Sequence, residues 1–303
     1  MTRIGIDLGG TKVEAVALDE EGREMVRERV ATPAGDYLGT LEAVRGLVER
    51  VVARIDGEYT IGVGTPGALS TVTGLLKNSN STCLNGRPLH ADLERLLGRP
   101  IRMMNDANCF ALSEATDGAA AGASVVFGVI VGTGTGAGIV VNGSVLTGPN
   151  AIAGEWGHNP LPWMDGSEHP GPACYCGKRG CIETFLSGPG MARDHAEATG
   201  RMLRPEEIVR GADRGDRACT ATLERYEDRM ARSLAHVINI LDPEVIVLGG
   251  GMSNIARLYE TVPRLLGRYV FSDTTRTRLV PPRHGDSSGV RGAAMLWSRF
   301  CEA

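Results

Sequence analysis

A plan of strand, glycine-rich turn and strand occurs twice in this chain of 303 residues, and it constrains the fold more than any other feature. The first copy covers residues 3–18, with its turn at Leu8-Gly9-Gly10-Thr11-Lys12. The second covers residues 125–143, with its turn at Gly132-Thr133-Gly134-Thr135-Gly136-Ala137-Gly138, and it closes on the hairpin pair Asn142-Gly143. Each copy opens a half of the chain, so the repeat predicts a duplicated lobe.

Strands and helices alternate between and after the two copies, which predicts an α/β fold. Strands are expected at 61–64, 100–104 and 245–248, and amphipathic helices at 38–55, 107–121, 223–241 and 289–300. The length is sufficient for two lobes. We expect a small lobe of residues 1–112 plus 289–303 and a large lobe of residues 113–288.

The charge balance excludes some partners. The formal net charge is −4, which gives no reason to expect a nucleic acid or an anionic membrane surface as a partner. The chain enters its first strand at once, and no apolar run is long enough to span a bilayer. We therefore expect a cytoplasmic protein.

The two glycine turns favour phosphate binding. Such turns expose backbone N–H groups and small hydroxyls that suit an anion. A Walker-type G-x-x-x-x-G-K-[ST] sequence is absent. The run 132–138 superficially resembles a dinucleotide fingerprint, but that fingerprint must open a helix, and residues 139–143 read as a strand and a turn. A single glycine loop is most simply explained as a tight turn, whereas two matched loops favour the binding of phosphate.

Three of the seven cysteines, Cys174, Cys176 and Cys181, fall within eight residues. Three thiolates and one imidazole form a common ligand set for structural zinc. His158 is the nearest upstream imidazole, and His169 is its rival. Reduced surface cysteines or a disulfide are the alternatives, although a cytosolic cluster of this kind favours a metal. Glu155 and Glu183 flank the ligands in the sequence, so a bound metal would fix the positions of these two carboxylates.

Eight segments together resemble the ROK family of sugar kinases and repressors, over nearly the whole chain. They are GIDLGGTK at 5–12, GTPG at 64–67, NDAN at 105–108, GTGTGAG at 132–138, GEWGH at 154–158, CYCGKRGC at 174–181, LGGGMS at 248–253 and GDSSGVRGAA at 285–294. Within the family, residues 77–82, 158–164 and 284–288 most resemble bacterial fructokinases or manno(fructo)kinases. The resemblance implies a two-lobed actin-like ATPase (ribonuclease H-like) fold with the active-site cleft between the lobes.

The resemblance also implies roles for individual residues. Asp106 would be the general base that takes the proton from the sugar hydroxyl; the plainer alternative is a helix N-cap. Asp7 would hold Mg²⁺, most simply through water. The residues implied in sugar binding are Asn80, Asn105, Asp106, Glu155, His158 and Glu183. The residues implied in ATP binding are Asp7, Gly9, Gly10, Thr11, Lys12, Gly132, Thr133, Gly134, Thr135, Gly136, Gly138, Gly249, Gly250 and Gly251.

Several of these roles have plainer alternatives: Asn80 as a loop residue, Lys12 as a surface charge, and Gly249 to Gly251 as a helix-entry turn rather than an adenosine pocket. Cys83, Cys109, Cys219 and Cys301 are read as ordinary packing or surface residues.

The resemblance implies an ATP-dependent kinase that phosphorylates the 6-hydroxyl of a hexose, with D-fructose as the expected sugar. A glucokinase or an N-acetylhexosamine kinase is the alternative within the same class. A sugar-sensing transcriptional regulator is the alternative from another class. Such regulators carry a DNA-binding domain before the first phosphate loop, and the loop here begins at Gly5. The expected partners are ATP, a hexose and a second copy of the chain in a homodimer.

Overall fold

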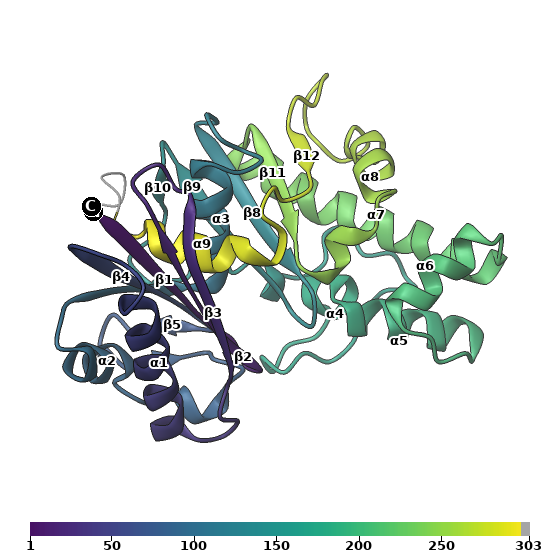
Figure 1. The fold of residues 1–303 in the computed structure, drawn as a ribbon. Coiled ribbons are helices and arrows are strands. Elements are labelled where there is room, and N and C mark those ends of the chain that lie inside the picture. Colours follow the sequence, from purple (N-terminus) through teal and green to yellow (C-terminus); the bar gives the residue numbers. More distant parts are fainter. Residues whose placement is uncertain (298–303) are drawn as a thin grey trace. The chain divides into compact units, whose positions relative to one another are not determined.

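Two five-stranded sheets carry the fold, and both have the same strand order in the computed structural model, which describes residues 1–297 (Figure 1). If the five strands of each sheet are counted along the chain, their order across the sheet is third, second, first, fourth and fifth. This shared order confirms the duplication. The first sheet has the order β3 (Glu24–Ala31), β2 (Lys12–Leu18), β1 (Thr2–Leu8), β4 (Tyr59–Thr65) and β7 (Ile101–Asn105). The second has the order β10 (Ser144–Val145), β9 (Thr135–Val141), β8 (Val125–Val131), β11 (Val245–Gly249) and β12 (Arg278–Val280).

The chain divides into two units. The first contains residues 1–122 and 138–153 and the C-terminal segment from Asp286; the second contains residues 123–137 and 154–285. The lobes expected from the sequence differ from these units. The expected large lobe includes residues 113–122, 138–153 and 286–288, which the structure assigns to the first unit. Residues 138–153 belong to the first unit because β10, which follows β9, packs against α3 (Asp106–Thr116).

Successive side chains along a strand point to opposite faces of the sheet, and in the first unit both faces are apolar. On β2, Ala15 and Ala17 pack with the buried face of α1 (Tyr37–Val52) and with α2 (Leu89–Leu97), whereas Val16 and Leu18 pack with α3 and α9 (Ser288–Met295). Figure 1 shows α1 and α2 together on one side of this sheet. The first unit therefore has two hydrophobic cores, one on each face of the sheet.

Helix α9 approaches the first sheet so closely that it requires glycine at Gly62. A Cβ atom at this position would lie 1.9 Å from the backbone oxygen of Ala293. We expect Gly62→Ala to lower the free energy of unfolding by about 1–3 kcal/mol or more, because overpacking a core usually costs this much. Urea denaturation of the purified variant measures this change.

Gly46→Ala is the matched control. Gly46 lies inside α1, and a Cβ there would meet only the end of the Arg50 side chain, at 3.7 Å. Because alanine favours the helix, this variant is expected to be up to about 1 kcal/mol more stable than the wild type. Equal stability of Gly62→Ala and the wild type would contradict the close approach of α9.

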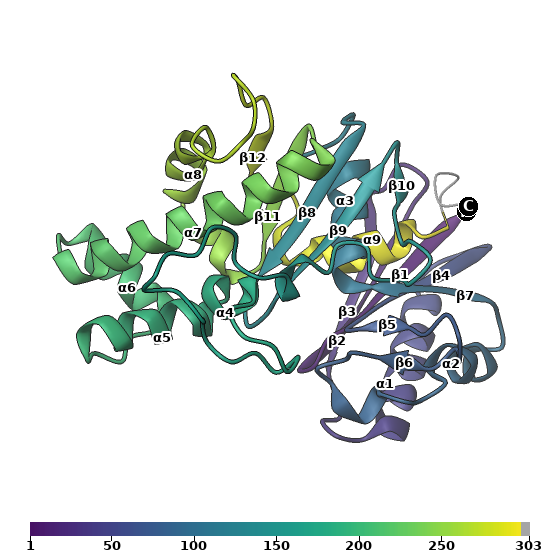
Figure 2. The same ribbon diagram turned by 180° about the vertical axis from the view of Figure 1, so that it is seen from behind.

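The second unit is built around the long helix α7 (Arg217–Leu241), which Figure 2 shows in full. It packs against α4 (Ile182–Leu186), α5 (Gly188–Thr199), α6 (Pro205–Asp213) and α8 (Leu258–Leu266). It ends where Asp242 adopts a positive φ of 46° immediately before Pro243, as the sequence predicts. Among the described residues, no helix is long and apolar enough to cross a membrane.

The expected strands and helices all form, with shifted ends. Helix α3 is shorter than predicted and ends at Thr116. The predicted last helix, 289–300, is observed as α9 over Ser288–Met295, and its predicted end lies outside the described residues. In the second glycine turn, the strand β9 begins already at Thr135, so Gly136 and Gly138 lie in a strand rather than in a loop. Short additional elements are β5 (Ala68–Leu69), β6 (Leu76–Lys77) and the 3₁₀ helices η1 (Thr82–Leu84), η2 (Trp156–His158), η3 (Gly251–Asn254) and η4 (Gly285–Ser287).

Candidate functional site

The first glycine turn is a tight connection between β1 and β2. The backbone N–H of Gly9 donates to the carbonyl of Lys12 over 3.0 Å. The Lys12 ammonium lies 3.3 Å from Oε2 of Glu14, which is fully buried and also accepts hydrogen bonds from Arg27 and Arg29. Lys12 is therefore held by a carboxylate, and its contact with a phosphate stays a prediction. Glu14 was not expected at the site; its position inside β2 carries no motif.

Asp7, at the end of β1, lies in a field of negative charge. Burial, the charge of Asp106 and the charge of Glu14 raise the pKa of Asp7 to about 6, while Lys12 acts in the opposite direction. A divalent cation would offset this repulsion, and carboxylate oxygens are ligands that Mg²⁺ prefers. The donor set at Asp7 therefore fits the predicted magnesium ion.

Asn105 and Asp106 stand where β7 ends and α3 begins. Asn105, not Asp106, is the N-cap of α3: its side-chain oxygen accepts from the N–H of Ala107 over 2.9 Å. The Asn105 amide also donates to the carbonyl of Gly67 over 3.1 Å, which ties the junction to the GTPG segment. Asp106 is the first helical residue, and its Oδ1 accepts from the same Ala107 N–H over 2.8 Å. Capping of α3 therefore does not require Asp106.

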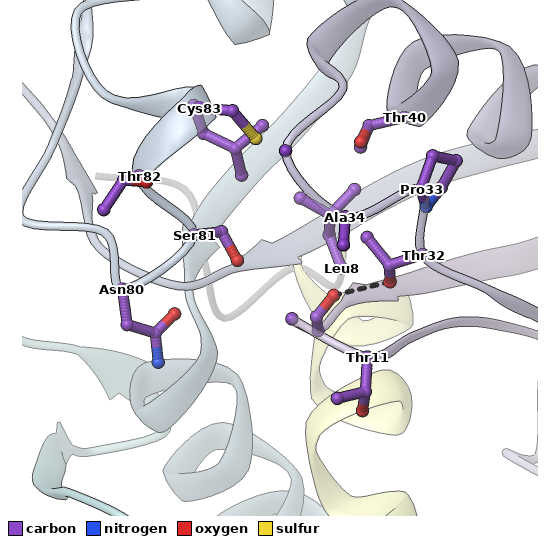
Figure 3. A pocket seen from close by; sticks show the side chains of 14 residues that line it. Leu8, Thr11, Thr32, Pro33, Ala34, Thr40, Asn80, Ser81, Thr82 and Cys83 are labelled. Carbon is purple, nitrogen blue, oxygen red and sulfur yellow. Dashed lines mark hydrogen bonds between the residues drawn. The ribbon is translucent and has the colours of Figure 1, made fainter.

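A cavity of about 340 Å³ opens beside the first glycine turn. Figure 3 shows Asn80, Ser81 and Thr82 on one side of it and Pro33 and Ala34 on the other. The turn is braced there by Thr32, whose hydroxyl donates to the carbonyl of Gly9 over 2.7 Å (Figure 3). The structure thus brings Asn80 together with Gly9, Gly10 and Thr11 in the first unit.

The second glycine turn lines a larger cavity, of about 940 Å³, in the second unit. Gly132 and Thr133 meet Gly251 in its wall, so two of the predicted ATP-binding segments converge. The rest of the wall comes from α5, α6 and η3 and from residues beside them, and only Met252 among these residues lies in a segment, LGGGMS, that the sequence analysis names. These residues are Gly188, Pro189, Ala192, Arg204, Pro205, Glu206, Val209, Arg210, Met252, Asn254 and Ile255.

Glu183 connects the second glycine turn to the cysteine segment. Its Oε2 accepts a hydrogen bond from the backbone N–H of Thr135 over 2.8 Å. The N–H of Gly188 donates to the carbonyl of Gly132 over 2.8 Å, which adds a second tie. The Thr135 hydroxyl is buried and has no hydrogen-bond partner among the described residues. Glu183 was expected to bind sugar hydroxyls, which stays a prediction; the structure shows that its carboxylate positions the second glycine turn.

The three cysteines and one histidine come together as the sequence predicts. One ligand atom each from His158, Cys174, Cys176 and Cys181 lies within 4.8 Å of the other three. The Nδ1 atom of His158 is 3.5 Å from the Cys174 sulfur, and the sulfurs of Cys176 and Cys181 are 3.6 Å apart. His169 is outside this group. Gly177 permits the turn between the cysteines with a φ of +86°.

Electrostatics of the cluster suit a cation. Burial raises the pKa values of the Cys174 and Cys181 thiols, that of Cys181 to about 12. Without a positive charge these thiols stay protonated at neutral pH, whereas a bound metal ion stabilises thiolates. Three sulfurs and one imidazole nitrogen at this spacing therefore fit Zn²⁺.

The insert between His158 and Cys174 is fixed by α7. Arg232 donates to the carbonyls of Pro162 and Trp163 and, with Arg229, to the buried carboxylate of Glu168. Arg229 also reaches Asp194 on α5 over 2.7 Å. The ion-pair network thus holds the segment that leads into the cysteine cluster.

Asp194 makes this network sensitive to acid. Burial alone would raise the pKa of Asp194, but hydrogen bonds from Arg225 and Arg229 outweigh it and hold the pKa below its ordinary value. Its contribution to stability is therefore complete above a pH of about 4 and is lost as the pH falls through the lowered pKa.

We expect Asp194→Asn to lower the free energy of unfolding by about 1–3 kcal/mol at pH 7, the range for hydrogen bonds to charged groups. The difference from the wild type should shrink as the pH falls below about 4, because Asp194 becomes protonated first in the unfolded chain and then, at the lowered pKa, in the folded one. Urea denaturation at a series of pH values measures this. A difference that does not change with pH would contradict the role assigned to the carboxylate.

The other described cysteines are not members of the cluster group. Cys109 and Cys219 are fully buried, and Cys83 is partly exposed at the wall of the smaller cavity. They match the expectation of packing or surface residues, while Cys301 lies outside the described residues.

Known proteins support the same reading of the chain. The model of the ROK family matches residues 3–299. N-acetyl-D-glucosamine kinase of Vibrio cholerae is 40% identical over 96% of this chain and 98% of its own. The ROK hexokinase of Thermus thermophilus is 33% identical, with a TM-score of 0.85 over 97% of each chain. A ROK glucokinase of Streptomyces griseus, solved with glucose and AMPPNP, is 27% identical, with a TM-score of 0.79 over 98% of this chain and 99% of its own.

These likenesses agree with the two-sheet architecture, which is the α/β actin-like ATPase fold. The chain therefore belongs to the ROK family, and it is an ATP-dependent sugar kinase.

Proposed function

We propose that this kinase transfers the γ-phosphate of ATP to the 6-hydroxyl of an N-acetylhexosamine, with N-acetyl-D-glucosamine as the preferred sugar. The observation that carries the proposal is the 40% identity to an N-acetyl-D-glucosamine kinase over nearly the whole of both chains. Fructose, the sugar expected from the sequence, has no such support, so we adopt the expected alternative.

Asp106 acts as the general base in this proposal. Its carboxylate takes the proton of the sugar hydroxyl while that oxygen attacks phosphorus, and ADP leaves. Asn80 and Asn105 in the first unit and Glu155, His158 and Glu183 in the second are proposed to bind the sugar hydroxyls. Each polar group of a buried sugar needs such a partner, because an unpaired one is costly.

The nucleotide is proposed to occupy the larger cavity, with its adenosine near Gly249 to Gly251 and its phosphates along the two glycine turns. Asp7 would hold the magnesium ion that accompanies ATP. That ion neutralises phosphate charge in such reactions. The remaining catalytic effect comes from positioning, for which the two glycine turns supply backbone N–H groups.

We propose Zn²⁺ as the occupant of the cluster, in a structural role. A four-ligand site has no open position for a substrate. The ion would fix His158 and the start of α4, which carries Glu183. Two further predictions from the sequence, a homodimer and a cytoplasmic location, are retained as proposals.

A panel of hexoses tests the proposed sugar. Purified protein with Mg-ATP should release ADP with N-acetyl-D-glucosamine at a kcat/KM at least about tenfold above that for fructose, glucose or mannose. A single contact between the sugar and its pocket can produce a ratio of this size. A coupled ADP assay with each sugar measures this. A preference for fructose would restore the original prediction for the sugar, and no turnover with any hexose would contradict the kinase site itself.

A further inference from the structure

Glu14 is a buried carboxylate on the face of the first sheet that α9 covers. Its cross-strand partner on β1 is Asp7, the residue predicted to hold magnesium. Residues directly opposite each other in an antiparallel pair share one face of the sheet, and on this face Val16 and Leu18 pack with α9. Two carboxylates therefore stand opposite each other next to the first glycine turn. Like charges in this arrangement destabilise a sheet, so the pair needs cations around it.

Two arginines of β3 satisfy the Glu14 carboxylate without the help of Lys12. Arg29 lies opposite Glu14 in the register of the sheet and donates to both carboxylate oxygens, over 3.0 and 2.9 Å. Arg27 donates to Oε1 over 2.5 Å. The Lys12 ammonium is a more distant donor, 3.3 Å from Oε2. A buried carboxylate needs paired partners, but the arginines supply them. Burial of Glu14 therefore does not require its contact with Lys12.

The contact instead restricts the movement of Lys12. Its side chain is 37% exposed, and its ammonium has three donors on a flexible stem. Lys12 and Glu14 are two residues apart on β2, so they share a face of the sheet with Asp7, which is a competing anion for the ammonium. Glu14 thus holds the ammonium on β2 through one donor, and two donors remain for another acceptor beside the glycine turn.

A second contact from the same cluster reaches the start of α9. Nη1 of Arg27 also donates to the hydroxyl of Ser287 over 2.9 Å. Ser287 is the residue before α9, and a Cβ atom built on Gly289 would lie 3.4 Å from Oδ2 of Asp7. Through Arg27, Glu14 therefore also fixes the segment that packs on Asp7. Both sets of contacts from Glu14 end beside residues of the predicted phosphate and magnesium site.

We propose that Glu14 is a positioning residue of the kinase, which holds the Lys12 ammonium on β2 to donate to a phosphate of ATP and keeps it from closing on Asp7. Glu14 itself touches neither substrate. This inference rests on the proposed binding of the ATP phosphates along the first glycine turn. It predicts that the loss of activity caused by a change at Glu14 is transmitted through Lys12 and does not arise from a general loss of stability.

Glu14→Gln keeps the size of the side chain and one acceptor oxygen but removes the charge that holds Lys12. We expect kcat/KM for ATP to fall about tenfold, the effect of one weakened contact with a charged group. The dissociation constant for the sugar, measured by calorimetry without nucleotide, should not change. A merely structural role of Glu14 would not produce this separation between the two substrates.

A double-mutant cycle shows whether Glu14 acts through Lys12. Lys12→Met leaves Glu14 with both of its arginines, so the variant should fold, and kcat/KM for ATP should fall about 10–100-fold. The double variant should be no worse than Lys12→Met, because a residue that acts only through another adds nothing once that other is gone. Steady-state kinetics of the four proteins measure the cycle.

Glu227→Gln is the matched control for burial. Glu227 on α7 is 1% exposed, as is Glu14, and it accepts from Nη2 of Arg257 over 3.1 Å. It lies in the second unit, outside the residues proposed to bind substrate. We expect a loss of stability in urea denaturation but an unchanged kcat/KM for ATP.

Labelling of the wild type gives a second test, which does not depend on the folding of Glu14→Gln. Acetic anhydride acetylates accessible lysines, and Mg-AMPPNP should slow the acetylation of Lys12 at least about tenfold, as expected for an ammonium engaged by phosphate. Lys77, whose ammonium contacts the carbonyl of Asn150, is the internal reference and should react equally with and without nucleotide. Mass spectrometry of peptides measures both rates.

The possible failures are distinguishable. Additive effects of Glu14→Gln and Lys12→Met would overturn the inference and assign Glu14 a structural role, with the proposed function intact. Equal acetylation of Lys12 with and without nucleotide would overturn it by removing Lys12 from the phosphates. Absence of turnover with every hexose in the wild type would contradict the proposed function, and the inference with it.

Discussion

Replacing Asp106 with asparagine is expected to lower kcat by about 10²–10⁴-fold, the range for removal of a general base. Asparagine keeps the size of the side chain and an oxygen that accepts from the Ala107 N–H, but it cannot take the proton of the sugar hydroxyl. The cap of α3 belongs to Asn105, so the helix should remain intact. Steady-state kinetics and sugar titration measure the effect, and sugar affinity should change little.

Asp36→Asn is the matched control for Asp106→Asn. Asp36 is the N-cap of α1, where its side chain accepts from the Gly39 N–H over 2.9 Å. Asparagine caps helices as well as aspartate does, so both stability and kcat should be retained. A folded Asp106→Asn variant with near-normal kcat would assign Asp106 a local structural role and require another base.

Replacing Cys176 with serine is expected to remove the metal and to weaken sugar binding by at least about tenfold, since His158 and Glu183 would lose their fixed positions. The wild type should contain about one zinc per chain, the count for a four-ligand structural site, and the variant about none. Elemental analysis and calorimetry with the sugar measure the two effects.

The effect of Cys176→Ser on nucleotide binding should be smaller but not zero. Glu183 accepts from the Thr135 N–H, so loss of order at the cluster would also disturb the second glycine turn. Cys219→Ala is the control: it removes a buried thiol outside the cluster and should keep the zinc. A metal-free wild type with full activity would refute the zinc site, and a Cys176→Ser variant that keeps its metal would remove Cys176 from the ligand set.

The sequence predicts those features of the fold that depend on local pattern. Alternation and glycine turns locate β1, β2, β8 and β9, and the repeat predicts the duplication that the shared strand order of the two sheets confirms. The ligand cluster is also predictable, because its members are close in sequence and few residue types bind zinc. Asn105 and Asp106 are identifiable from their place at the end of a strand.

Features that depend on tertiary contacts are not predictable in this way. No local pattern indicates that α5 and α6 supply the wall of the larger cavity, or that Glu14 holds Lys12. Tyr175 resembles any exposed aromatic residue until the structure places its hydroxyl on His158. The identity of the sugar is harder still, because a single side chain that faces one hydroxyl can change the preference among closely similar hexoses.

The position of the transferred phosphate tests the central claim most directly. Wild-type protein, Mg-ATP and N-acetyl-D-glucosamine are incubated to completion, and the product is analysed by ³¹P–¹H correlation NMR. The account predicts a single phosphomonoester whose phosphorus couples to the protons of carbon 6, with one ADP formed for each sugar consumed. A phosphate on another carbon, or ADP release without any sugar phosphate, would contradict it.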